Sequence, residues 1–264
     1  MTMSNIAFVS HGGGPLPVLG DPAHTELVNT LKSLSTELPA KPSVIVVVSA
    51  HWETDGFEIT ASAQPDLLYD YYGFPDESYK LTYPALGAPE LAQELTNKLS
   101  KNGIKARLNK VRGYDHGVFI PLMLMYPDAS IPVLEVSVDN TLDPELHWKM
   151  GEELGRALPD DALIIGSGFS FHNMRAFFSP KTGSFKSVVN HFQTWLDDTI
   201  TQESFSVEDV KERWKGWADI DGGRFCHPRE EHLIPAIVCH GAAQKQGSAI
   251  PFEALGVEAR HFKW

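Results

Sequence analysis

The sequence predicts an α/β fold, in which one domain holds a central, mostly parallel or mixed sheet flanked by helices. Apolar runs typical of buried strands alternate along the chain with stretches of helical periodicity, as expected of a layered α/β domain. No repeat, low-complexity tract or linker divides the 264 residues, a length that suits one large domain. We therefore expect a single domain over residues 1–264.

The strands are predicted mainly from short apolar runs bounded by Gly, Pro or polar residues. The run at 44–50 is the most hydrophobic, and continuous runs of this kind are typical of strands buried on both faces of a parallel sheet. The predicted strands cover residues 6–10, 44–50, 57–63, 104–108, 131–138, 162–167 and 253–261.

The helices are predicted from apolar residues at helical spacing and from capping residues. Leu27, Leu31 and Leu34 mark one face of the first helix, with Asp21 as its cap. The predicted helices cover residues 22–38, 88–101, 118–125, 144–157, 184–203, 206–217 and 227–244, the last with Pro228 in its first turn. Residues 64–87, rich in Pro, Gly, Tyr and Asp, form a long loop without a period, and such loops are often functional.

Composition narrows the range of partners. The formal net charge of -12 argues against nucleic acid or an anionic membrane as the main partner. No apolar stretch approaches the ~20 residues needed to span a bilayer, and the first residues lack the charged segment of a secretory signal. We expect a cytoplasmic protein, and a homo-oligomer is compatible with the sequence. The only two cysteines, Cys226 and Cys239, are interpreted as buried thiols.

Four of the apolar runs break at or beside a histidine. His11 follows the first strand, His51 the second, and His172 comes a few residues after the strand at 162–167, while His232 precedes the apolar run that begins at Leu233. Ligands of open α/β sheets bind beyond the carboxyl ends of the strands. Imidazole is a common ligand of Zn, Fe, Cu and Ni, so this placement predicts a metal site.

The remaining histidines are interpreted individually. Surface positions are expected for His24, His147, His191 and His261. His240 is expected to pack on its helix. His116, in Asp115-His116-Gly117, either holds a loop backbone or donates a hydrogen bond to bound substrate or oxygen.

Three competing motifs are incomplete. The glycines after His11 lack the GxGxxG spacing and the P-loop lysine, which favours a ligand over a phosphate-binding turn. His227 and His232 are five residues apart and match neither HExxH nor HxxEH. Ser167 lies in a Gly-Ser-Gly that falls short of the GxSxG elbow, so we interpret it as a small residue at a strand exit.

Taken together, the chain closely resembles the extradiol aromatic ring-opening dioxygenases of the DOPA-dioxygenase type, which are related to the catalytic subunit of protocatechuate 4,5-dioxygenase. The specific elements, in chain order, are Ser49-Ala50-His51-Trp52, Asp115-His116-Gly117 and Glu231-His232 followed by Pro235. Further matching segments are Ser10-His11-Gly12, Gly73-Phe74-Pro75, Tyr83-Pro84-Ala85, Met125-Tyr126-Pro127 and His172-Asn173. The resemblance implies one extradiol ring-cleavage domain over residues 1–264.

The resemblance implies a mononuclear, non-haem Fe(II) site. His11, His51 and His232 match the family's metal ligands, and His172 is either a fourth ligand or an acid/base. Protocatechuate-type enzymes resemble a 2-His-1-carboxylate triad, which leaves open whether His232 or Glu231 faces the ion. Three imidazoles are also a familiar zinc environment, so Zn(II) is a second ion that isolated protein could carry.

The implied reaction opens a catechol-type ring with O₂ to give a muconic semialdehyde-type product. His172 is then the favoured base, and His116 hydrogen-bonds bound oxygen or catecholate. Trp52 and Tyr114 are expected to shape the ring pocket.

Two other functions stay open from the sequence. One is a non-catalytic binding protein like those of the Memo type, which share this fold family, and the other is a zinc hydrolase that uses the same histidines. Arg175, Arg224 and Arg229 lie near the motifs, where each either pairs with a substrate carboxylate or is an ordinary surface charge.

Overall fold

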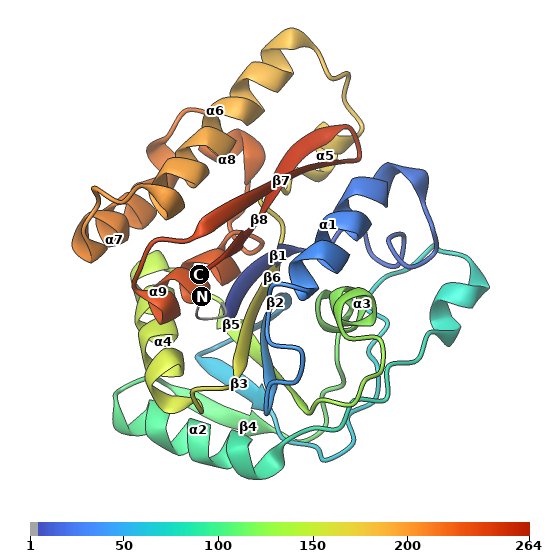
Figure 1. The fold of residues 1–264 in the computed structure, drawn as a ribbon, viewed down its shortest axis with the longest axis vertical. Helices are drawn as coiled ribbons and strands as arrows, with labels where there is room; N and C mark the ends of the chain where they lie inside the picture. Colours follow the sequence, from blue (N-terminus) through green and yellow to red (C-terminus); the bar gives the residue numbers. More distant parts are fainter. Residues whose placement is uncertain (1–4) are drawn as a thin grey trace.

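The computed structural model describes residues 5–264, whose centre is an eight-stranded mixed sheet (Figure 1). The strands are β1 (Ile6–Ser10), β2 (Ile45–Thr54), β3 (Phe57–Thr60), β4 (Ala106–Asn109), β5 (Val133–Asp139), β6 (Leu163–Gly168), β7 (Ser248–Ala254) and β8 (Val257–Lys263). Their order is β4-β3-β5-β2-β6-β1-β8-β7. The central pairs β5–β2, β2–β6 and β6–β1 are parallel, whereas β1–β8 and β8–β7 are antiparallel. The predicted α/β fold with a mixed, mostly parallel sheet is confirmed.

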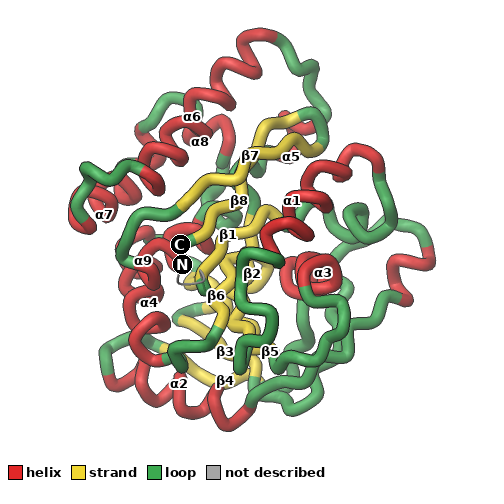
Figure 2. The backbone as a smooth tube through the Cα atoms, in the orientation of Figure 1, coloured by secondary structure: helices red, strands yellow, loops and turns green. Residues whose placement is uncertain are grey.

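Helices cover both faces of this sheet. They are α1 (Thr25–Ser35), α2 (Pro89–Lys101), α3 (His116–Met125), α4 (Pro144–Ala157), α5 (Met174–Phe177), α6 (Gly183–Thr201), α7 (Val207–Lys215), α8 (Gly223–Cys226) and α9 (Ile234–Ala243). Helices α4 and α9 pack together on one side of the sheet, and α1 and α3 lie on the other (Figure 1). Long loops gather around α3 (Figure 2), and residues 64–87 contain just a short 3₁₀ turn at Asp76–Lys80 and an isolated β-bridge from Leu67 to Tyr114.

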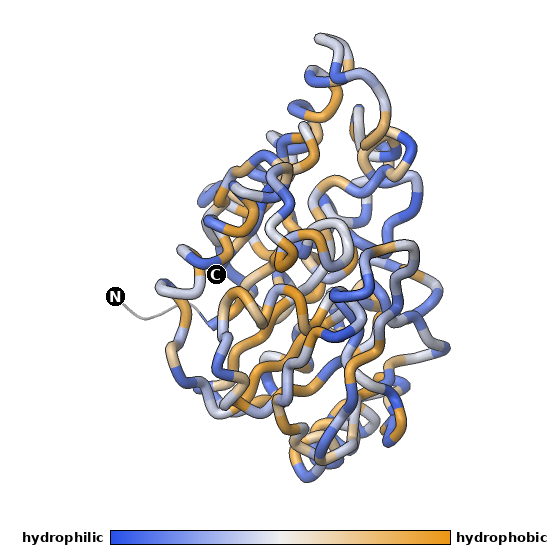
Figure 3. The backbone as a smooth tube through the Cα atoms, turned by 90° about the vertical axis from the view of Figure 1, so that its right-hand side faces the viewer, coloured by the Kyte–Doolittle hydropathy of each residue, from blue (hydrophilic) through white to orange (hydrophobic). Residues whose placement is uncertain are grey.

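The core is built from the strands that the apolar runs predicted. Every residue of β1, β5 and β6 is buried, and so are residues 45–50 of β2. Hydrophobic segments accordingly concentrate inside the molecule and hydrophilic ones toward its periphery (Figure 3). Among residues 5–264, no helix is long and apolar enough to cross a membrane. The expectation about a secretory signal falls partly on residues 1–4, outside the described range.

Two segments near the C-terminus differ from the prediction. The strand expected at 253–261 is a hairpin of β7 and β8, because Leu255 and Gly256 take φ of 55° and 71° and reverse the chain. The helix expected at 227–244 begins only at Ile234, with Pro235 in its first turn. His232 therefore lies in the turn that enters α9, not on a helix.

Three histidines expected at the surface are buried instead. His24, His147 and His261 are each fully buried, whereas His191 is exposed as predicted. Each buried ring has hydrogen-bond partners: the backbone N–H of Asp139 donates to His147 Nε2, and that of Ser10 to His261 Nδ1. His240 and both cysteines are buried, as predicted.

Candidate metal centre and its pocket

His11 is held by the end of β1 and by the glycine turn that follows it. Its backbone N–H continues the sheet by donating to the Gly168 carbonyl at 3.0 Å. Gly12 then takes a φ of 90°, which favours glycine. The Gly13 N–H donates to His24 Nε2 at 3.0 Å, while His24 Nδ1 contacts an Asp21 carboxylate oxygen at 2.6 Å. The buried His24 thus fixes the turn, a role its sequence position does not indicate.

The partner of His11 determines which of its ring nitrogens is free. His11 Nδ1 lies 2.9 Å from the Ser167 hydroxyl, which itself donates a short hydrogen bond to the Gly117 carbonyl. Because that hydroxyl proton is already committed, Ser167 must accept from His11 Nδ1–H. The lone pair is then on Nε2, the atom that points into the site. Ser167 is therefore more than the small residue expected at a strand exit.

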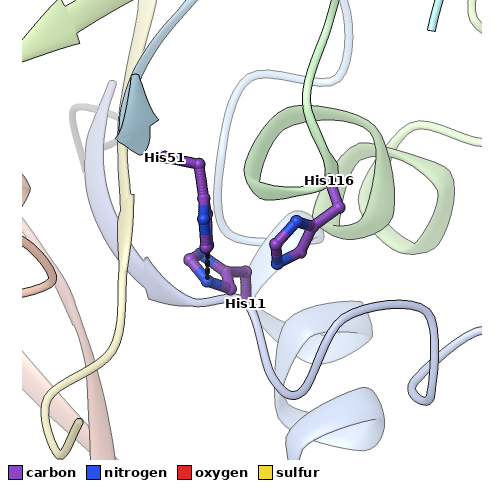
Figure 4. Close-up of side chains that lie close together, drawn as sticks. All are labelled: His11, His51 and His116. Atoms are coloured by element: carbon purple, nitrogen blue, oxygen red, sulfur yellow. Dashed lines mark hydrogen bonds between the residues drawn. The ribbon is translucent and has the colours of Figure 1, made fainter. Parts of the chain in front are cut away.

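His51 occupies the centre of the cluster. It lies where the register of β2 against β5 shifts between Val48 and Glu53. Its Nε2 is 3.0 Å from His11 Nε2 and 3.3 Å from His232 Nε2. Figure 4 shows the rings of His11, His51 and His116 converging from β1, β2 and the start of α3.

His232 is placed by the end of β6. The His232 carbonyl accepts from the Phe169 N–H at 3.1 Å, and a Cβ on Gly168 would come within 2.1 Å of that carbonyl oxygen. Only glycine lets the two segments approach this closely. The carboxylate of the neighbouring Glu231 lies on the opposite side of the His232 ring from Nε2, because its Oε1 is 3.1 Å from His232 Nδ1.

Asp70, in the long loop, orients His116. One carboxylate oxygen accepts from both the backbone N–H and Nδ1 of His116, at 3.0 and 2.8 Å. The other oxygen is 3.6 Å from His51 Nδ1. His116 Nε2 is thereby left for the pocket, and nitrogens of His11, His51 and His116 all lie within 4.8 Å of one another. Asp70 is not among the predicted site residues, and the length of its loop is the one feature of the sequence that points to it.

His172 lies at the edge of the cluster. Its ring stacks on that of His232, with centroids 3.4 Å apart and planes at 15°. Its Nδ1 is 3.2 Å from Glu231 Oε1. Glu231 thus contacts the Nδ1 atoms of both His172 and His232, so a single carboxylate orients two rings.

The electrostatics keep the central imidazoles neutral. Burial, reinforced by the neighbouring histidines, lowers the pKa of His11 and of His232 well below the usual value. Burial and the proximity of His116 lower the pKa of His51 to about 4. For Glu231, burial is the largest single effect and acts to raise the pKa, but the hydrogen bond from His172, a backbone hydrogen bond and the charges of His172 and Arg229 together outweigh it, so the net shift of the pKa is downward. Neutral imidazoles and an ionised supporting carboxylate are the states that metal binding requires.

The nitrogen spacing fits one transition-metal ion. Two imidazole nitrogens each about 2.1 Å from an ion, at roughly 90–109° to each other, stand about 3.0–3.4 Å apart. The separations from His51 to His11 and to His232 are 3.0 and 3.3 Å. Each of these nitrogens would otherwise face another lone pair, which a shared cation relieves. The donor set therefore suits Fe(II) or Zn(II).

A pocket of 460 Å³ opens over the histidines. All five site histidines line it, together with the glycine turn and the loop residues Tyr71 and Phe74. Trp52 and Tyr114, expected to shape a ring pocket, are buried and are not among its lining residues. The Tyr114 hydroxyl donates to the Val133 carbonyl at 2.7 Å. Phe74 and Tyr71 lie in the pocket wall, where Trp52 and Tyr114 were expected.

A buried polar network supports His51 from beneath. The His51 N–H donates to the Ser49 hydroxyl, which donates to Asp115 at 2.8 Å. Burial and the charge of Asp115 raise the pKa of Glu135 well above its usual value. Burial opposes ionisation of Asp115, but the hydrogen bond from Glu135 and nearby positive charge lower its pKa to about 2. Arg112 pairs with Asp115 at 2.8 Å and covers the Trp52 ring, which explains where Trp52 packs.

Comparison with known proteins places this geometry in a family. Residues 6–259 match the family model described as the catalytic LigB subunit of aromatic ring-opening dioxygenase. Dioxygenase tasH of Hapsidospora irregularis is 35% identical over 100% of this chain and 86% of its own. The 4,5-DOPA dioxygenase extradiol of Beta vulgaris is 35% identical over 92% and 88%.

A solved structure agrees with the fold. Uncharacterized protein JW3007 from Escherichia coli K12 matches with a TM-score of 0.76 and 29% identity, over 98% of both chains. The family match and the curated relatives span nearly the whole chain, including every histidine of the cluster. The protein therefore belongs to the family of aromatic ring-opening dioxygenases that includes the catalytic LigB subunit.

Proposed function

We propose that this protein is an extradiol dioxygenase that opens a catechol-type ring with O₂ at a mononuclear non-haem Fe(II) site, acting as one domain over its whole length. The observation that carries the proposal is the convergence of neutral histidine nitrogens on one point beneath an apolar pocket. The reaction incorporates both atoms of O₂ and gives a muconic semialdehyde-type product, so it needs no external reductant. Bound Fe(II) supplies the redox chemistry that allows O₂ to react with the ring.

His11, His51 and His232 are the proposed ligands. The lone pair that Ser167 leaves on His11 Nε2, and the position of Glu231 behind the His232 ring, both favour this set over one that includes the carboxylate. Three neutral ligands leave the full charge of a divalent ion to be balanced by a doubly ionised catechol. His116 is the second candidate for the third ligand, because its nitrogen also lies close to those of His11 and His51.

His172 is the proposed acid/base. Its Nδ1–H is directed at the ionised Glu231, so the lone pair of Nε2 is available to accept a proton from a catechol hydroxyl in the pocket. Glu231 stabilises the imidazolium that results. The same nitrogen can return the proton later in the reaction. Its stacking on His232 keeps the ring at the edge of the site, which suits proton transfer better than metal coordination.

His116 is proposed to hydrogen-bond the catechol oxygens or bound oxygen. Because Asp70 accepts from Nδ1–H, Nε2 is the atom that meets the ligand. A neutral His116 accepts there from a catechol hydroxyl, and a protonated one donates to a developing oxygen anion. Asp70 stabilises the second state by its charge.

Oxygen uptake by protein loaded anaerobically with Fe(II) tests the proposal. We expect catechol to consume O₂ with the appearance of a yellow ring-opened product. His172→Gln should abolish turnover while retaining the metal, and His191→Gln, a change on the exposed face of α6, should have no effect on either. Full iron occupancy without O₂ uptake across a panel of catechols would instead favour a Memo-like binding protein. Metal-dependent hydrolysis without O₂ uptake would favour a zinc hydrolase.

A further inference from the structure

Beyond the histidines, the pocket is lined by apolar side chains. Its outer walls are formed by Leu16, Phe74, Phe169, Met174, Phe177 and Leu255. Among the described residues that line this pocket, none is Lys, Arg, Asp or Glu. A substituent on a bound catechol therefore meets carbon, with no fixed charge beside it.

The arginines that could have paired with a substrate carboxylate are directed elsewhere. Arg224 pairs with Glu230 at 2.6 Å and covers the ring of Trp217. Arg229 forms a bidentate ion pair with Glu53, outside the pocket.

A second hollow, which shares His172 with the pocket, has arginines in its lining. This hollow of 640 Å³ is lined by Arg175 and Arg229, and also by Glu231, whose charge opposes theirs. His172 lines both the pocket and the hollow. Its ring stacks on that of His232, and its Nδ1 contacts the carboxylate of Glu231. Arg175 is thus the guanidinium that a negatively charged substrate would have to reach.

The rim of the apolar pocket is also hydrophobic and exposed. Met174 and Phe178 line the pocket, yet they are 57% and 87% exposed. Large apolar side chains clustered at the mouth of a pocket favour a ligand that covers them. An apolar group that extends outward from the ring would do so.

We propose that the catechol taken by this site carries an uncharged, apolar substituent, such as an alkyl or aryl group, rather than a carboxylate or an amino-acid group. The inference rests on the proposed ring-cleavage function. A carboxylate in the pocket would lose its hydration without gaining a counter-charge, whereas an alkyl chain would gain contact with the outer walls. This specificity differs from that indicated by the names of several relatives, the 4,5-DOPA dioxygenases.

A matched pair of substrates tests the inference: 4-propylcatechol and 3-(3,4-dihydroxyphenyl)propionate, which differ in charge but little in ring electronics. We expect the propyl compound to have the higher kcat/KM by at least about tenfold. We also expect the propyl compound to bind more tightly, with the lower dissociation constant, when binding is measured without O₂ on metal-loaded protein. Equal or better binding of the propionate would overturn the inference.

Variants locate the preference on the pocket wall. Met174→Arg places a cation at the rim of the pocket. It should improve binding of the propionate and so reduce the preference for the propyl compound. Val111→Arg adds the same charge at a residue that is 91% exposed and outside the pocket, and should change neither dissociation constant. If propionate binds well and Arg175→Ala abolishes that binding, the second hollow receives the carboxylate and the inference is wrong.

Binding and turnover also separate the two proposals. A preference for the propyl compound without ring opening of it or of unsubstituted catechol would refute only the proposed reaction. Ring opening of both compounds with a preference for the propionate would refute only the apolar specificity.

Discussion

Replacing Ser167 by alanine should weaken metal binding, although Ser167 is not itself a proposed ligand of the metal. The Ser167 hydroxyl accepts from His11 Nδ1–H at 2.9 Å and donates to the Gly117 carbonyl. His11 is only 1% exposed and Ser167 is fully buried, so solvent has little access to replace the lost hydroxyl. The variant leaves a buried donor unsatisfied and no longer specifies which ring nitrogen carries the proton.

Two estimates of the magnitude agree. Leaving a buried donor without its partner costs about 1–3 kcal/mol. Loss of a residue that orients a metal-bound histidine typically lowers metal affinity about 10–100-fold, which corresponds to about 1.4–2.7 kcal/mol. We therefore expect Ser167→Ala to bind Fe(II) or Zn(II) about 10–100-fold more weakly than the parent protein.

Competition with a chelator of known affinity measures this change, and urea unfolding of the metal-free protein measures stability. Ser137→Ala is the matched control, because Ser137 is equally buried and accepts from the Glu58 N–H at 2.8 Å, and its other hydroxyl partner is Thr54 rather than a histidine of the cluster. The control should lose stability and keep metal affinity. Unchanged metal affinity in Ser167→Ala would refute the tautomer argument.

Three further predictions concern the supports of the site and the buried histidines. Gly168→Ala should lower the free energy of unfolding by about 1–3 kcal/mol and weaken metal binding, because its Cβ would meet the His232 carbonyl oxygen at 2.1 Å; chelator competition and urea unfolding check this, and a parent-like variant would contradict it. Asp70→Ala should lower kcat about 10–100-fold with metal retained, whereas Asp70→Asn, which keeps an acceptor for His116 Nδ1–H, should recover most of the lost kcat. Steady-state kinetics and metal analysis measure both variants, and equal impairment of the two would contradict the role of Asp70 as the acceptor for His116. Burial lowers the pKa of His240 to about 3, whereas a histidine of the unfolded chain has a pKa near 6.5, so the unfolded chain binds the extra proton and the free energy of unfolding falls as the pH drops below about 6.5. His240→Gln should reduce the slope of the free energy of unfolding against pH by about 1.4 kcal/mol per pH unit between about pH 6 and pH 4. Urea unfolding of metal-free protein measures this slope, and an unchanged slope would refute the prediction.

The sequence predicted the central sheet because its strands are continuous apolar runs that allow few other interpretations. Strands β1, β2 and β6 lie within a few residues of the predicted boundaries, and α4 matches its prediction at both ends. The histidines at those strand ends do converge, because parallel strands bring their carboxyl ends to one edge of the sheet. This part of the site follows from local pattern and from topology.

The supporting residues could not be predicted, because their roles depend on contacts between distant segments. Asp70 reaches His116 across 46 positions, and Ser167 reaches His11 across 156. A surface position is predicted for His24 because it falls within the helix expected at 22–38, but the glycine turn folds back onto it. The predicted start of the last helix rests on Pro228 in its first turn, but α9 begins at Ile234 and it is Pro235 that lies in the first turn.

Isotopic labelling of the product is the decisive test of ring opening by O₂. Protein loaded with Fe(II) is given catechol under ¹⁸O₂, the product is trapped at once by borohydride reduction, and its mass is measured. Extradiol cleavage at this histidine cluster predicts a ring-opened product that carries both labelled oxygen atoms. A ring-opened product without both labels, or unchanged catechol in the presence of fully iron-loaded protein, would contradict it.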